Sequence, residues 1–83
     1  MKYENGKWRS TFEATEQVFW DKTYCPKPVR CEVVAAKVTH DGQGSEKVQI
    51  RIIEDCVDER FGTVHAKKGV VKWVDGNNIR RAA

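Results

Sequence analysis

Apolar and polar positions alternate along the middle of the chain. Between residues 29 and 33, and again between 47 and 54, apolar side chains recur at every second position. A period of two is typical of a half-buried β-strand. The alternation slips by one position at residues 34–36, which predicts a bulge or a strong bend. The segment HDGQGS at 40–45 has the composition of a turn between the two strands.

The C-terminal part alternates over shorter stretches. Residues 54–60 are acidic and indicate a loop. Residues 61–74 hold two β-rich segments around a Lys-Lys-Gly triplet, which predicts a hairpin whose Gly69 adopts the positive φ of the turn. Residues 75–78, with the sequence DGNN, predict a second tight turn, and residues 79–81 then end the chain's patterned part as a short strand or extended tail.

The N-terminal segment favours strands over a helix. The pair Asn5-Gly6 lies between aromatic-bearing arms, as in a type I′ hairpin turn. Residues 8–14 alternate with a period of two, which indicates a strand, while a capping-box sequence beginning at Ser10 leaves a short helix as the alternative. Residues 21–28 contain two prolines and indicate a connection.

These elements predict one all-β domain. A flat sheet of this size would expose one face and both edges, whereas a small, strongly twisted antiparallel barrel buries the alternating apolar set. We expect a single domain over 1–83, with the barrel strands in 29–81 and residues 1–24 packed on it as a hairpin, strand or short helix. The predicted core residues are Val29, Cys31, Val33, Val48, Ile50, Ile52, Val64, Val71 and Trp73.

Two segments carry a resemblance to a known fold. The run WVDGNNIRR at 73–81 resembles the end of SH3-like barrels, where the penultimate strand passes through a short turn into a brief closing strand. The run VRCEVV at 29–34 looks like the opening strand of such a barrel. The resemblance implies an SH3-like small barrel. Because residues 40–46 contain no aromatic side chain, it does not imply recognition of proline-rich ligands.

Composition and charge limit the classes of function that the chain can have. The longest apolar runs are three and four residues, whereas a membrane span needs about 20 and a signal-peptide core about 7–15, so we expect neither. The net charge of +3 is unevenly distributed, with residues 61–83 at +4 and residues 29–60 at −2. A basic stretch beside an aromatic residue suits weak, sequence-independent binding of nucleic acid or another anionic partner. The candidate residues are Lys67, Lys68, Lys72, Arg80 and Arg81.

The cysteines and histidines offer little chemistry. Cys25, Cys31 and Cys56 are odd in number, which indicates reduced, partly buried thiols, with a Cys25–Cys31 disulfide on oxidation as one alternative. Three thiolates with His40 or His65 could hold zinc, but the spacing lacks a C-x-x-C pair. A thiol–imidazole pair and a cation site among the acidic residues of 54–59 are weaker hypotheses. No catalytic motif is present, so we expect no enzyme, no metal and no cofactor.

Aromatic residues crowd the N-terminal segment. They either cap an open end of the barrel or form an exposed patch of the kind that marks interfaces. The candidate interface residues are Trp8, Phe12, Phe19 and Trp20. The sequence therefore predicts a cytoplasmic, non-catalytic binding module that acts through a protein partner or self-association. Weak nucleic-acid binding is the first alternative, and a zinc-stabilised domain is the second.

Overall fold

The computed structural model describes residues 2–39 and 45–82, so most of the predicted turn at 40–45 lies outside the described residues. The chain is built almost entirely of antiparallel strands, and the all-β prediction is confirmed. The strands are β1 (Lys2–Glu4), β2 (Lys7–Arg9), β3 (Gln17–Trp20), β4 (Val29–Thr39), β5 (Ser45–Ile52), β6 (Cys56–Asp58), β7 (Thr63–Ala66), β8 (Val71–Asp75) and β9 (Ile79–Arg81), with the 3₁₀ turn η1 (Gly76–Asn78) before the last.

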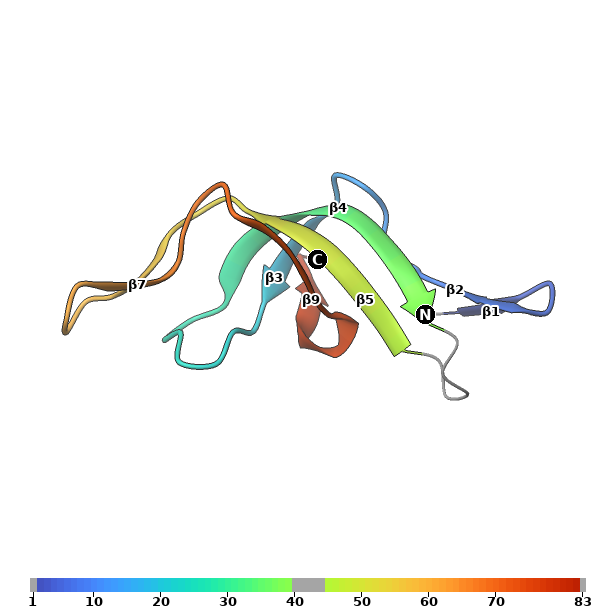
Figure 1. Ribbon diagram of the computed structural model, residues 1–83, viewed down its shortest axis with the longest axis horizontal. Coiled ribbons are helices and arrows are strands. Elements are labelled where there is room, and N and C mark those ends of the chain that lie inside the picture. Colours follow the sequence, from blue (N-terminus) through green and yellow to red (C-terminus); the bar gives the residue numbers. More distant parts are fainter. Residues whose placement is uncertain (1, 40–44, 83) are drawn as a thin grey trace.

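Five strands form the main sheet, in the order β8-β5-β4-β3-β9. Its two edge strands, β8 and β9, are joined only by η1. In a flat sheet these edges would lie about 19 Å apart, and three residues of 3₁₀ turn rise only about 6 Å. The sheet must therefore curl, as Figure 1 shows for β4 and β5. The predicted sequence of a penultimate strand, a short turn and a closing strand is confirmed, whereas closure of a barrel stays a prediction.

The turn η1 is held by its capping residue. The Asp75 side chain accepts a hydrogen bond from the Asn77 backbone N–H at 2.9 Å. Beyond the turn, the Asp21 N–H donates to the Asn78 carbonyl at 2.8 Å, which attaches η1 to the end of β3. The turn predicted at 75–78 thus forms, and it starts β9 in register with β3.

The predicted slip in β4 is a β-bulge. The pairing of β4 with β5 shifts register between Val33 and Ala35. Val33 lies opposite Ile50 before the bulge, and Ala36 lies opposite Val48 after it. The extra residue keeps Ala36 on the inner face, where it packs against the core.

The core lies on the concave face of the sheet. Its buried residues are Val18, Trp20, Val29, Cys31, Val33, Val48, Ile50, Ile52, Cys56, Ala66, Val74 and Ile79. Six of the nine predicted core residues are among them, but Val64, Val71 and Trp73 are exposed. The prediction had the wrong phase for β8. Because Val74 pairs with the buried Val48, its neighbour Trp73 must point to the outer face.

The hairpin predicted over residues 61–74 does not form. Strand β7 pairs with β6, and β8 pairs with β5 in the main sheet. The connection between β7 and β8 returns the chain to the sheet, where the Gly69 N–H donates to the Ile52 carbonyl at 2.7 Å. Gly69 does adopt the expected positive φ, +93°. Charged residues on both sides of the short β6 hid its strand pattern.

The N-terminal turn is confirmed, and the strand predicted after it is displaced. Asn5 and Gly6 both adopt positive φ, at 53° and 77°, between β1 and β2. Residues 10–16 form neither the predicted strand nor the alternative helix. There the Ser10 hydroxyl accepts from the Phe12 N–H, and the Thr15 N–H donates to Val33. The next strand is β3, which lies between β4 and β9 and so begins the main sheet before Val29.

Two hairpins extend from opposite ends of the curled sheet (Figure 1). One is β1–β2, which we call the N-terminal arm (residues 2–9). The other contains β6 and β7, and we call it the acidic arm (residues 54–66). The molecule measures 49 × 23 × 21 Å, and the arms account for its elongated outline.

Candidate functional site

The N-terminal arm presents two aromatic rings to solvent. Tyr3 and Trp8 face each other across β1 and β2, with ring centroids 5.1 Å apart and an edge-to-face angle of 68°. Tyr3 is 62% exposed and Trp8 is also exposed. A two-stranded hairpin alone is only marginally stable in water, and this cross-strand aromatic pair helps to hold β1 to β2.

The acidic arm presents aliphatic and aromatic side chains in the same way. Val57 and Val64 lie opposite each other in β6 and β7, and both are exposed. Phe61, at the turn, is 77% exposed. The turn itself is fixed by Asp58, whose carbonyl accepts from the backbone N–H groups of Phe61 and Gly62. The arm therefore holds these three apolar side chains on an ordered frame outside the core, whereas Cys56 and Ala66 at its base are buried in the core.

The structure separates the four predicted interface residues. Trp8 lies on the N-terminal arm. Phe12 is partly buried against the core, with the Arg81 guanidinium 4.4 Å from its ring centroid. Phe19 lies on the outer face of β3, whereas Trp20 is a core residue that is only 7% exposed. They do not form one patch.

Sequence reasoning missed most of the exposed apolar residues on the arms. These are Tyr3, Val57, Phe61 and Val64. Tyr3 could have been found from the hairpin turn at Asn5-Gly6, because that turn sets it directly opposite Trp8. The residues of the acidic arm gave no comparable signal, since Val64 was placed in the core and residues 54–60 in a loop.

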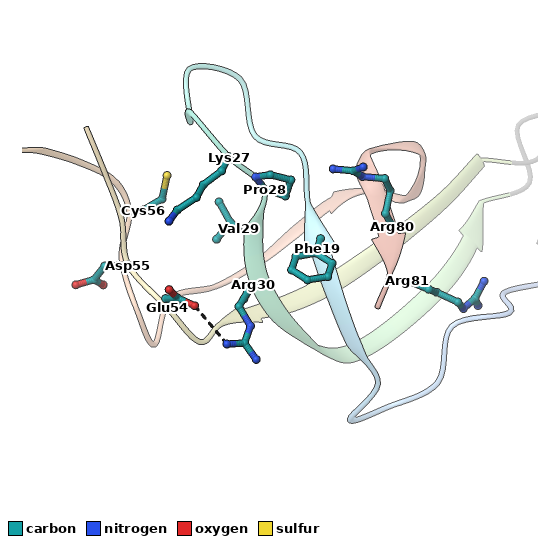
Figure 2. A pocket seen from close by; sticks show the side chains of 10 residues that line it. All are labelled: Phe19, Lys27, Pro28, Val29, Arg30, Glu54, Asp55, Cys56, Arg80 and Arg81. Atoms are coloured by element: carbon teal, nitrogen blue, oxygen red, sulfur yellow. Dashed lines mark ion pairs between the residues drawn. The ribbon is translucent and has the colours of Figure 1, made fainter. Parts of the chain in front are cut away.

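The structure does not gather the five predicted cationic residues into one cluster. Arg81 donates to the Glu16 carboxylate at 2.6 Å and to the Thr11 carbonyl at 2.6 Å, which fixes it against residues 10–16. Lys72 lies on the inner side of β8, with its ammonium 5.0 Å from the Trp20 ring centroid. Lys67 and Lys68 occupy the connection between β7 and β8. Arg80 and Arg81 both line the pocket on the outer face of the sheet (Figure 2).

A pocket of about 500 Å³ lies on the outer face of β3, β4 and β9, beside the start of the acidic arm (Figure 2). Phe19 pairs with Arg30 on one side and with Arg80 on the other, so the phenyl ring stands between two guanidinium side chains. Both arginines already have carboxylate neighbours. Arg30 lies 3.6 Å from Glu54, and Arg80 lies 2.8 Å from Asp21. These pairs are exposed and therefore weak enough to be exchanged for another anion.

The three cysteines are free thiols, and the Cys25 thiol lies near enough to Cys56 for the two to interact. Burial raises the pKa of Cys31 to about 12. The pKa of Cys25 is raised to about 11, with burial as the main cause and a hydrogen bond with Cys56 as the second cause. Both thiols are thus protonated at neutral pH, which disfavours a nucleophilic or metal-ligating role.

The metal-site and histidine hypotheses find little support in the described ranges 2–39 and 45–82. Within them, no group of three or more His, Cys, Asp and Glu residues is arranged to hold a metal ion. The His65 imidazole lies 3.7 Å from Asp58, and His40 lies outside those ranges. No helix in that part of the chain is long and apolar enough to span a bilayer.

Comparisons with known proteins return no relative. No protein-family model matches the chain, and no curated protein or solved structure matches it either. The geometry of the two arms and of the outer-face pocket is therefore the basis for a functional proposal.

Proposed function

We propose that the chain is a non-catalytic self-association module whose two arms contact further copies. The observation that carries this proposal is the exposure of Tyr3 and Trp8 on one arm and of Phe61 on the other, all outside the core. A short hairpin with few tertiary contacts is stabilised when its apolar face is covered. Exposed apolar clusters of this kind mark interaction surfaces.

The contribution of each arm to the free energy of association can be estimated from its apolar side chains. Burying a large apolar side chain such as Phe61 contributes about 1.5–3 kcal/mol. Truncating one such anchor should therefore weaken the association constant about 10- to 150-fold. An effect of that size is within reach of a concentration series on the purified chain.

The test is sedimentation velocity over a wide concentration range. The parent chain should exceed its monomer mass of 9.5 kDa at high concentration. Trp8→Ser and Phe61→Ser should each shift association to higher concentration. Tyr24→Ser is the matched control, because Tyr24 is 84% exposed but lies between β3 and β4, off both arms. A parent chain that stays monomeric throughout would contradict the proposal, as would an equal effect of Tyr24→Ser.

A second candidate function, weak binding of single-stranded nucleic acid, is favoured by one observation. Phe19 stands between Arg30 and Arg80 on an open sheet face. An aromatic ring flanked by cations suits base stacking with phosphate contacts beside it. Such binding would be weak and would fall steeply with added salt.

Binding of a labelled oligothymidylate at low salt distinguishes the pocket from the lysine-rich connection as the nucleic-acid surface. If the pocket binds it, Arg30→Ala and Arg80→Ala should each reduce affinity several-fold, and Lys67→Ala should not. A loss with Lys67→Ala alone would instead favour the lysine-rich connection predicted from the sequence. Binding that none of these variants changes would argue against both placements.

A further inference from the structure

The two arms carry opposite charge. Residues 2–9 contain three cationic side chains and one acidic one, for a net charge of +2. Residues 54–66 contain four acidic side chains and one arginine, for a net charge of −3 with His65 neutral. Each charge cluster accompanies exposed apolar side chains on the same hairpin. The arms therefore match each other in both properties that an interface uses.

Local ion pairs leave this difference in place. Lys2 lies 3.2 Å from Glu4 within the N-terminal arm, so the arm's excess positive charge resides on Lys7 and Arg9. On the acidic arm, Glu54 lies near Arg30 of the sheet. The excess negative charge is then carried by Asp55, Asp58 and Glu59. Of these, Asp55 accepts a hydrogen bond from the Lys68 N–H, and Asp58 lies 3.7 Å from the neutral His65.

The matching surfaces cannot meet within one chain. They extend from opposite ends of a molecule 49 Å long, with the curled sheet between them (Figure 1). An N-terminal arm can therefore meet an acidic arm only on another copy. A contact between two different surfaces is heterologous. The copy at each end of such an assembly therefore keeps one unused arm, to which a further copy can bind.

We propose that copies of this chain associate head to tail, with the N-terminal arm of one copy docking on the acidic arm of the next. In this contact Tyr3 and Trp8 cover the apolar residues around Phe61, and Lys7 and Arg9 face the acidic residues of 55–59. Because the contact leaves an arm of each kind unused, it builds an open chain of copies, or a ring if the rotation between copies closes. This inference rests on the proposed self-association through the arms.

The decisive experiment is complementation between two variants, each with one arm inactivated. The first carries Tyr3→Ser and Trp8→Ser, and the second carries Phe61→Ser and Val64→Ser. None of these residues belongs to the core cluster, and far-ultraviolet circular dichroism of each variant checks that the sheet is retained. Measured by sedimentation velocity, each variant alone should be monomeric. An equimolar mixture should form a one-to-one dimer and nothing larger, since only one productive interface can form.

Other outcomes are informative in different ways. If either variant alone still self-associates, like arms pair with like, and the head-to-tail arrangement is wrong although self-association stands. If both are monomeric and their mixture is too, while the parent associates, the arms do not dock on each other and the inference fails. If the parent itself never associates, the failure lies with the proposed function.

Charge reversal adds a readout that a loss of folding would not reproduce. Arg9→Glu should weaken association of the parent chain, and so should Glu59→Arg. Each reversal reduces the attraction between the two arms' net charges, so added salt should weaken association of the parent more than that of either reversed chain. A reversal that changes neither the association constant nor its salt dependence would contradict the charge matching.

Discussion

Truncation of Ile50 in β5 tests the core most sharply. Its side chain is fully buried, and in β5 it lies opposite Val33 of β4. Ile50→Ala removes three carbon groups, worth about 2.4 kcal/mol in transfer free energy at about 0.8 kcal/mol each. The unfilled cavity adds to this, so we expect a loss of about 3–4 kcal/mol in the free energy of unfolding.

A chain of this length has a total stability of roughly 4–12 kcal/mol, so the loss is a large part of it. Urea unfolding followed by tryptophan fluorescence measures it directly, because Trp20 is buried in the same core. The urea concentration at the unfolding midpoint should fall, with little change in the slope of the unfolding free energy against urea concentration. The melting temperature should drop by about 15–25 °C. A loss below about 1 kcal/mol would refute the assignment of Ile50 to a packed interior.

Trp73→Ala is the contrasting variant, because the alternation along 70–74 predicted this residue in the core. In the structure Trp73 is 44% exposed, and the Lys37 ammonium lies 4.6 Å from its ring centroid. Truncation should cost about 1 kcal/mol, from the cation–π contact and partial burial. Buried tryptophans cost about 3–5 kcal/mol on truncation to alanine, so a loss in that range would show that β8 has the opposite phase.

Three further predictions concern the cysteines and the turns. Mild oxidation by a disulfide reagent should cross-link Cys25 to Cys56, detected by peptide mapping, and Cys25→Ser should abolish the cross-link; a Cys25–Cys31 product would contradict the proximity of Cys25 to Cys56. Because the folded pKa values of Cys25 and Cys31 lie above the ordinary thiol value of 9.0, the thiols' contribution to stability is complete below pH 9. It should be lost as the pH rises from 9 towards 12, and a stability that increases over that range in urea titrations would refute the assigned burial. Asp75→Ala should lower the unfolding free energy by about 1 kcal/mol through loss of its cap on η1, whereas Asp75→Asn should largely retain it.

Much of the main sheet was predictable because its signals are local. The period of two fixed the inner residues of β4 and β5, and the one-residue slip at 34–36 located the bulge. The Asn5-Gly6 turn was predictable because its two positive φ values suit those residues. The turn before β9 was predictable from the DGNN sequence, since the aspartate caps it.

The partners of the short C-terminal strands were not predictable. The exposed Val64 and Trp73 both satisfy an alternating pattern, and such a pattern does not show which of its two phases faces the core. The exposure of Val64 depends on the pairing of β7 with β6, and β6 has only three residues, Cys56–Asp58. The apolar part of the acidic arm followed from that pairing and was therefore missed with it.

Hydrogen exchange at low and high protein concentration tests the central claim most directly. Hairpins that project from the sheet should exchange the amide protons of their outer parts quickly in the monomer and become protected when they dock. We predict that protection of β1–β2 and β6–β7 rises with concentration, while protection of β4 and β5 stays constant. Protection of both arms that is independent of concentration would contradict self-association through the arms.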